Sequence, residues 1–440
     1  MGAGIAQLGC QAGMRTLLFD PLPEARERGE AAIRKRLGDD AAELVVVDDV
    51  EALSACDLVI EAVPERPSLK RDLFGQLSAL NPDIVLATNT SSILVTSLAG
   101  AAARPENVVG MHFFNPPPVM KLVEVIPAEQ SGEEAVRLVT EVAERMGRHP
   151  IRVVDGPGFL VNRCNRPFGA EALRLLQERV ATPEQIDRIV RLAGGYRMGP
   201  FELMDLVGID VGFEVAQSFT EQSFGEPRWK PSPLQAKKVA AGKLGRKTGS
   251  GWYDYPPGRP DDPEPLAPGG GEGRSVRVAG EGRLWDELRE RARAAGFDEG
   301  DDLVIGEDVV LRDGRSAGGR IGFHALPPLG SLVELCGERD EGVESVFRAL
   351  GFHCEWVGDA PGLVLGRIAA QLVNEAAFAI GEGVGTAADV DAGMKLGLNH
   401  PRGPVEWWRA IGTEHVVSIL DALREERYRV APLLRRGALE

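Results

Sequence analysis

Residues 107–126 read NVVGMHFFNPPPVMKLVEVI, and this stretch decides how the first part of the chain folds. It holds two short apolar runs, which predict two strands, and the Asn-Pro-Pro-Pro run at 115–118 between them forces a reversal. His112 and Glu124 are equidistant from Pro118, so antiparallel pairing would bring imidazole and carboxylate together. Such a pair raises a histidine's basicity and fixes its tautomer for general-base catalysis. Each residue alone also has an ordinary explanation, as a buried core histidine and a solvent-facing glutamate.

Length and composition restrict the class of protein. A chain of 440 residues is too long for one ordinary core, so roughly two to four domains are expected. Its 43% hydrophobic and 26% charged residues are typical of a globular protein. The net charge of −16 argues against nucleic acid and membrane surfaces as partners. Neither a spanning apolar run nor a secretory signal is found in the sequence.

The cysteine and histidine patterns predict neither a disulfide framework nor a metal site. The cysteines are five, an odd number, and never form C-x-x-C, and the six histidines form no H-x-x-x-H pair. We therefore expect no metal, and a reducing cytoplasm as the location.

The first residues carry part of a nucleotide-binding pattern. Residues 2–12 have helical spacing with Gly13 as a stop, and the strand-like run 16–20 ends in Asp20. This is the later part of a dinucleotide fingerprint, in which the chain begins at the third glycine, Gly2. An ordinary surface helix explains the segment equally well. Asp20 suits the two ribose hydroxyls, and Pro21 stands where an NADP enzyme tends to place arginine, which favours NAD.

Strands and helices then alternate. A charged helix is predicted at 24–37, strands at 44–47, 57–63 and 83–87, and a helix at 68–80. This alternation predicts a parallel doubly wound sheet. The run Thr-Asn-Thr-Ser-Ser at 88–92 follows the last of these strands. It is either the cap of a helix or a loop that brings a hydroxyl into the cleft at the sheet's edge, and both can hold.

From residue 153 the pattern becomes helical. Helices are predicted at 159–177, which bears Asn162, at 183–192 and at 201–206, with no strand before 251–253. The Pro- and Gly-rich run 256–274 predicts a linker. The apolar runs 303–305, 309–311 and 331–335 predict a small α/β module. The Gly-Arg-Lys-Thr-Gly run at 245–249 lacks the spacing of a P-loop.

An internal repeat accounts for the remainder. Asp155-Gly-Pro-Gly recurs as Asp359-Ala-Pro-Gly, 204 residues later (359 − 155), and the same offset relates Thr182 to Thr386 and Gly199-Pro200 to Gly403-Pro404. Asn162 maps onto Gly366, so the second helical copy is interpreted as structural. The two copies are expected to pair, either within one chain as a pseudo-dimer or between chains as a homodimer.

Taken together these motifs resemble the 3-hydroxyacyl-CoA dehydrogenase family over nearly the whole chain. The matching runs are GAGIAQ, TNTSS, HFFNPPPVMKLVEVI, PGFLVNR and GRKTGSGWY. The resemblance implies that His112 is the general base, Glu124 its carboxylate partner, and Ser91 and Asn162 the groups that bind the substrate's oxygens. It implies NAD as cofactor, with contacts at Gly2, Asp20, Glu65, Lys70, Ser91, Asn115 and Lys247.

The resemblance also implies an acyl-CoA substrate. Arg34, Lys35 and Arg36 are the candidates for its phosphates. The tandem arrangement is similar to bacterial members that oxidise 3-hydroxyadipyl-CoA in phenylacetate breakdown, while the shorter 3-hydroxybutyryl-CoA dehydrogenases share the catalytic residues. The family's first strand and first two fingerprint glycines have no counterpart here. We therefore expect a truncated sequence or a start codon placed too late, with an inactive CoA-binding or scaffold protein as the alternative.

The predicted fold is an α/β Rossmann-like doubly wound sheet followed by an all-α domain, a small degenerate α/β module and a second all-α domain. The predicted boundaries are 1–152 for the NAD-binding domain, 153–255 for the helical domain, 256–277 for the linker, 278–357 for the module and 358–440 for the second helical repeat.

Overall fold

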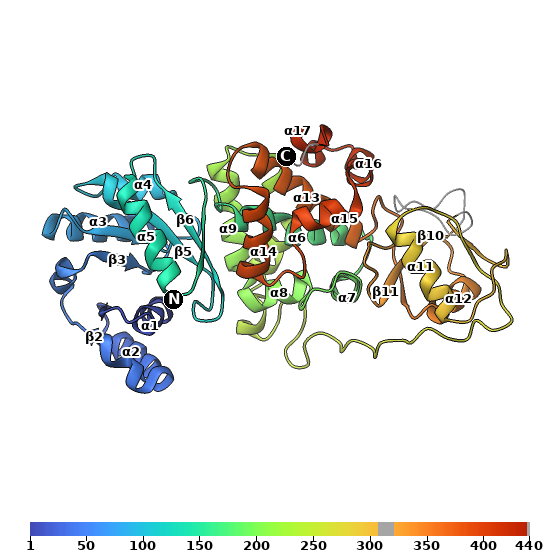
Figure 1. Ribbon diagram of the computed structural model, residues 1–440, viewed down its shortest axis with the longest axis horizontal. Coiled ribbons are helices and arrows are strands. Elements are labelled where there is room, and N and C mark those ends of the chain that lie inside the picture. The colour runs from blue at the N-terminus through green and yellow to red at the C-terminus, as the bar shows by residue number, and fades with distance from the viewer. Residues whose placement is uncertain (307–320, 438–440) are drawn as a thin grey trace. The chain divides into compact units, whose positions relative to one another are not determined.

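The computed structural model describes residues 1–306 and 321–437 and divides the chain into two compact units (Figure 1). The first comprises Met1–Arg163 and Glu382–Asn399, and the second comprises Cys164–Gly381 and His400–Glu440. The predicted run 309–311 lies outside the described residues. None of the helices in the described part is both long and apolar enough to cross a bilayer.

The first unit contains two sheets. Five strands pair in the order β3 (Leu58–Glu61), β4 (Val85–Thr88), β5 (Val108–Phe113), β6 (Leu122–Pro127) and β7 (His149–Arg152). All neighbours are parallel except β5 and β6, which are antiparallel as the central stretch predicted. A separate parallel pair is formed by β1 (Thr16–Leu18) and β2 (Leu44–Val46), so the predicted continuous sheet is in two parts. Strand β7 was not predicted, because its sequence, HPIR, shows no strand pattern.

Helices cover the five-stranded sheet. The helices of this unit are α1 (Gly2–Gln11), α2 (Pro23–Leu37), α3 (Pro67–Leu80), α4 (Val95–Ala99), α5 (Glu133–Arg145) and α14 (Ala387–Leu398). One hydrophobic cluster joins α1 and α5 to Val109, Met111 and Phe113 of β5. Because side chains alternate along a strand, His112 lies on the opposite face of β5 from this cluster.

The second unit is mainly helical. It contains most of α6 (Val161–Gln177), then α7 (Pro183–Leu192), α8 (Pro200–Val207), α9 (Ile209–Gln222), α10 (Pro233–Ala240), α13 (Leu365–Gly381), α15 (Pro404–Ile411), α16 (Thr413–Leu423) and α17 (Pro432–Arg435). Short 3-10 helices occur in the two units at Gly38–Glu43, Val50–Ala55, Pro105–Asn107, Pro227–Trp229, Arg246–Thr248 and Glu426–Tyr428. The strand pattern predicted at 251–253 is wrong. The Asp205 carboxylate instead accepts the amides of Trp252 and Tyr253, and isolated bridges occur only on either side of this segment, at Ser250 and Asp254.

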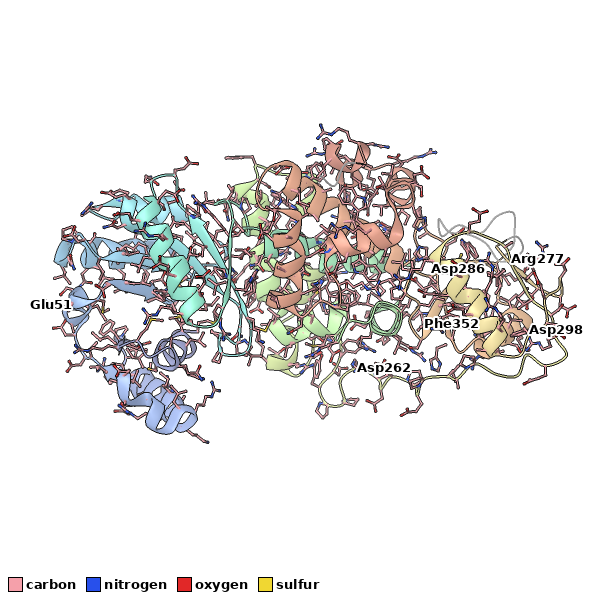
Figure 2. The ribbon with its side chains drawn as sticks, viewed as in Figure 1. Glu51, Asp262, Arg277, Asp286, Asp298 and Phe352 are labelled. Carbon is pink, nitrogen blue, oxygen red and sulfur yellow. The ribbon has the colours of Figure 1, made fainter. Side chains whose placement is uncertain are left out.

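A small α/β part lies within the second unit. Its elements are β8 (Arg277–Val278), α11 (Arg283–Ala294), β9 (Val304–Ile305), β10 (Gly322–His324), β11 (Leu332–Cys336), α12 (Glu341–Ala349) and β12 (His353–Trp356). Strands β10, β11 and β12 pair first antiparallel and then parallel, as β5, β6 and β7 do. Phe352, labelled in Figure 2, is fully buried in the core of this part.

The two helical repeats make the same contacts in both directions. In the first unit, the Val154 amide donates to the Val384 carbonyl at 3.1 Å; in the second, Gly358 donates to Val180 at 2.6 Å. Gly358 is the 204-residue counterpart of Val154, and Val384 is the counterpart of Val180. Each repeat therefore donates from one position to the carbonyl of the other repeat at the equivalent position. Arg163–Glu382 and Arg367–Glu178 form a second such couple of ion pairs. This reciprocity is the signature of an isologous interface.

Candidate active site

The histidine and glutamate that the central stretch brings together form a buried pair. His112 lies opposite Glu124 in the β5–β6 register, and Nδ1 of His112 is 2.7 Å from Oε2 of Glu124. Only 5% of His112 and none of Glu124 is exposed. The other carboxylate oxygen, Oε1, accepts the backbone amides of Leu160 and Val161 at 3.0 and 2.9 Å. The predicted meeting of imidazole and carboxylate is therefore confirmed.

The geometry assigns the tautomer of His112. An ionised carboxylate can only accept, so Nδ1 carries the proton that it shares with Glu124. The lone pair of Nε2 then becomes the basic site of the ring. The centroid of the Phe114 ring lies 4.6 Å from that of the His112 ring, and the centroid of the Phe159 ring lies 5.8 Å from it. Two aromatic side chains therefore pack near the imidazole. This arrangement suits the abstraction of a proton from an alcohol.

The loop at 88–92 is held by one carboxylate. Oε1 of Glu65 accepts hydrogen bonds from Thr90 Oγ1 at 2.6 Å, from the Ser91 amide at 3.0 Å, and from both the amide and the hydroxyl of Ser92. Burial alone raises the pKa of Glu65, but the Thr90 bond and the charge of Lys70 outweigh it and hold the pKa below its usual range. The loop is thereby fixed with Ser91 close to the end of β4.

The same loop is tied to the strand that carries the histidine. Oδ1 of Asn89 accepts the backbone amide of Phe113 at 2.8 Å. Since β4 and β5 are parallel neighbours, their carboxyl ends lie side by side. The structure thus brings the predicted residues Ser91 and His112 to adjacent strand ends. Asn162 directly follows Val161, whose amide binds Glu124, so a third predicted site residue lies next to the pair.

Lys70 lies beneath this loop. Only 1% of its surface is exposed, and its ammonium contacts Oε1 of Glu61 at 2.7 Å and Oε2 of Glu65 at 3.2 Å. Glu61 also accepts the Thr88 hydroxyl at 2.7 Å. The lysine predicted as a cofactor contact therefore acts on Glu65 in this structure, and through Glu65 on the 88–92 loop.

The residues predicted for the nucleotide fit a dinucleotide. Gly2 begins α1, whose first amides lack partners within the helix, and a Cβ at Gly2 would lie 3.8 Å from Ala62 at the end of β3. Asp20 follows β1, and its Oδ1 accepts the Leu22 amide. Asn115 is exposed just beyond β5. A helix N-terminus for phosphate and a strand-end carboxylate for ribose are the groups that NAD requires.

The remaining predicted site residues stay predictions. Lys247 belongs to the second unit, where its ammonium is 2.6 Å from Oδ1 of Asp210. On α2, Arg34 pairs with Glu30 at 2.8 Å, Arg36 donates to Gln7 at 3.2 Å, and Lys35 is exposed on the same helix. Within the described residues, no group of three or more His, Cys, Asp or Glu side chains could hold a metal ion.

A second histidine–glutamate pair was missed from the sequence. His324 lies opposite Glu334 in the β10–β11 register, and the Glu334 carboxylate accepts the amides of Val364 and Leu365 at 2.6 and 3.0 Å. These two amides are the 204-residue counterparts of those that bind Glu124. The signal was present: His-x-x-Pro-Pro followed by Leu-Val-Glu at 324–334 repeats His-Phe-Phe-Asn-Pro-Pro and Leu-Val-Glu at 112–124, with a shorter connection.

The second pair differs from the first in its surroundings. A Cβ at Gly366, the counterpart of Asn162, would lie 2.2 Å from Cε1 of His324, so the imidazole fills the space that a larger residue would need. Nε2 of His324 lies 3.3 Å from Nε2 of His415. Burial raises the pKa of Glu334 to about 8. The counterpart of Asn162 is thus a glycine, Gly366, and the His324 ring contacts protein atoms where a substrate would otherwise lie.

The fold and the first pair define a dinucleotide-dependent dehydrogenase. The model of the 3-hydroxyacyl-CoA dehydrogenase NAD-binding domain matches residues 1–156, and that of its C-terminal domain matches 158–255 and 362–438. The chain belongs to the 3-hydroxyacyl-CoA dehydrogenase family, and it is an NAD-dependent oxidoreductase. The family resemblance predicted from the motifs is confirmed.

Several relatives show how far the similarity extends. The 3-hydroxyadipyl-CoA dehydrogenase of Escherichia coli K12 is 36% identical over 100% of this chain and 95% of its own length. A probable 3-hydroxybutyryl-CoA dehydrogenase of Deinococcus radiodurans is 42% identical, covering 58% of this chain and 96% of its own. A crystal structure of a protein named 3-hydroxybutyryl-CoA dehydrogenase, from E. coli K12, superposes with a TM-score of 0.85 at 33% identity, covering 100% of this chain and 96% of that one.

Proposed function

We propose that this chain oxidises the 3-hydroxyl of a (S)-3-hydroxyacyl-CoA to a 3-oxo group, with His112 as general base. The observation that carries the proposal is the buried 2.7 Å contact between His112 and Glu124 at the strand ends of an NAD-binding module. Ser91, in the loop that follows the neighbouring strand β4, and Asn162, the residue after Val161, are proposed to bind the substrate's oxygens.

Each protein group has a defined task in this reaction. Nε2 of His112 takes the hydroxyl proton as C3 gives up its hydride, and Glu124 stabilises the imidazolium that results. In the reverse direction the imidazolium returns the proton to the 3-oxo oxygen. The Leu160 and Val161 amides keep the Glu124 carboxylate oriented while this happens. NAD, when bound, supplies the hydride acceptor; Gly2, Asp20, Glu65 and Asn115 are the residues of the first unit proposed to hold it.

We propose 3-hydroxyadipyl-CoA as the substrate, in the breakdown of phenylacetate. Its support is that the relative so named matches this chain over its full length, second repeat included. The second candidate is 3-hydroxybutyryl-CoA, which the name of the protein in the full-length structural match favours. We place the protein in the cytoplasm, with its two repeats paired inside one chain, since the reciprocal contacts between them are made within this chain.

The test is NADH oxidation with 3-oxoadipyl-CoA and with acetoacetyl-CoA. It is run on the full chain, and kcat/KM is compared between the two substrates. A higher kcat/KM with 3-oxoadipyl-CoA supports the first candidate, and the opposite preference supports the second. A folded protein that binds NADH but reduces neither substrate overturns the proposal in favour of a scaffold.

A further inference from the structure

The segment Glu382–Asn399 belongs to the second helical repeat, yet it lies in the same compact unit as the histidine–glutamate pair. Helix α14 within this segment contacts β6, the strand that carries Glu124. The side chain of Leu122, two residues before Glu124, lies on the same face of the strand and against α14. The helix therefore covers the face of the sheet on which the pair stands.

Three glycines let the segment that contains α14 pack closely against the residues around the pair. A Cβ at Gly385 would lie 2.6 Å from Cδ2 of Leu160, and one at Gly393 would lie 2.6 Å from Cγ2 of Val161. A Cβ at Gly397 would meet Cδ2 of Leu122 at 2.9 Å and the Phe114 ring at 3.4 Å. Gly393 and Gly397 are four residues apart, so they share one face of α14. At these three positions the backbone lies so close to its neighbours that any side chain would collide with them.

The residues that these glycines touch are the ones that hold the pair. Leu160 and Val161 donate the two amide hydrogen bonds to Oε1 of Glu124. Phe114 packs its ring 4.6 Å from the ring of His112. The second repeat thus touches the direct supports of both the base and its carboxylate.

The first repeat offers an internal comparison. Its residues at the corresponding positions, 204 earlier, are Ala181, Ile189 and Ala193, all of which carry side chains. Its helix α7 contacts β11, the strand that carries Glu334 of the second pair. At these three positions glycine therefore occurs only beside the pair that retains Asn162, although a Cβ at Gly194 of the first repeat would lie 2.9 Å from Cδ1 of Leu365 beside the second pair.

We propose that the segment from Gly385 to Gly397 is a positioning element of the active site, through which the second repeat fixes the geometry of His112 and Glu124. This inference rests on the proposed function. The second repeat then serves catalysis in the first, although its own pair has lost the counterpart of Asn162.

The test uses the full chain with Gly393→Ala, and with Gly385→Ala and Gly397→Ala as further variants. The control is Ala388→Leu, which adds bulk to an exposed position of the same helix. Alanine favours a helix interior over glycine, so Gly393→Ala and Gly397→Ala are expected to fold. We expect kcat to fall roughly 10- to 100-fold with the KM for NAD unchanged, since small displacements of a catalytic group have effects of this size.

A second measurement is independent of turnover. The imidazole of His112 is titrated by NMR, with its signal assigned through His112→Gln, and its midpoint is expected to move in Gly393→Ala but not in Ala388→Leu. Folded glycine variants with unchanged kcat and an unchanged His112 titration overturn the inference, as does an equal loss in Ala388→Leu. If the parent chain turns over no acyl-CoA, the proposed function fails, while the titration still decides the positioning role.

Discussion

At the scale of single residues, each carboxylate oxygen of Glu124 has its own function: one contacts His112 and the other accepts two backbone amides. Oε2 faces His112, and Oε1 receives the amides of Leu160 and Val161. An aspartate or glutamate in this position orients the imidazole and balances its positive charge. Both oxygens are needed, because loss of the first removes the charge partner and loss of the second leaves buried amides without an acceptor.

Glu124→Gln separates these functions. The glutamine carbonyl can keep the two amide bonds, but its NH2 group cannot accept the Nδ1 proton, so the wrong tautomer of His112 is favoured. We expect kcat to fall by roughly 10²- to 10⁴-fold, with NADH affinity close to that of the parent protein. Steady-state kinetics and a fluorescence titration of NADH measure the two quantities. Equal losses in both would argue for a structural role of Glu124.

At the scale of elements, the β5–β6 pairing places the histidine–glutamate pair, and Gly110 allows that pairing to pack. A Cβ at Gly110 would lie 2.8 Å from Cβ of Ile126 on β6 and 2.9 Å from Cγ2 of Val95 on α4. Both neighbours are fully buried. The close contact of strand and helix therefore depends on the missing side chain.

Gly110→Val is expected to destabilise the fold by about 1–3 kcal/mol, as overpacking of a filled core does. Gly100→Ala is the control, because a Cβ there meets nothing within 4 Å. The free energy of unfolding in urea measures both. If the two variants unfold at the same urea concentration, the packing of β5 against β6 and α4 is looser than the structure shows.

At the scale of the whole molecule, residues from both repeats build shared cores. His400, from the second repeat, lies with its ring centroid 5.5 Å from that of Phe168 and 5.0 Å from that of Tyr196, both in the first. Burial lowers the pKa of His400 to about 4. The folded chain therefore resists protonation of this ring, whereas the unfolded chain accepts a proton near its ordinary pKa of about 6.5.

The sign of the pH dependence follows from this difference. The contribution of His400 to stability is complete above about pH 6.5 and is lost as the pH falls toward 4, by about 3 kcal/mol in all. His400→Phe is expected to reduce the loss of stability over this interval. Urea unfolding at pH 7 and pH 4.5 measures it, with His149→Gln, an exposed histidine, as control. A parent-like pH dependence in His400→Phe would contradict the assignment.

The spacing of the repeat explains why the second histidine–glutamate pair was not predicted from the sequence. The 204-residue offset runs without a gap from β7 and β12 onward, and it was recognised from short motifs such as Gly199-Pro200. Before that point the spacing between the copies changes, since Glu334 is 210 residues from Glu124 and His324 is 212 from His112 (334 − 124 and 324 − 112). One fixed offset therefore does not align the second pair with the first.

The amino-acid sequence by itself determined the local elements and the first pair. Alternation of apolar residues, turn residues and the symmetric spacing about Pro118 are properties of adjacent residues, and they led to β5, β6 and the meeting of His112 with Glu124. Only the tertiary structure decided which distant segments touch. That Gly385, Gly393 and Gly397 lie against the supports of this pair, and that Glu65 holds the 88–92 loop, depends on long-range packing. Such packing is set by the complementarity of buried surfaces across the fold, which no local pattern encodes.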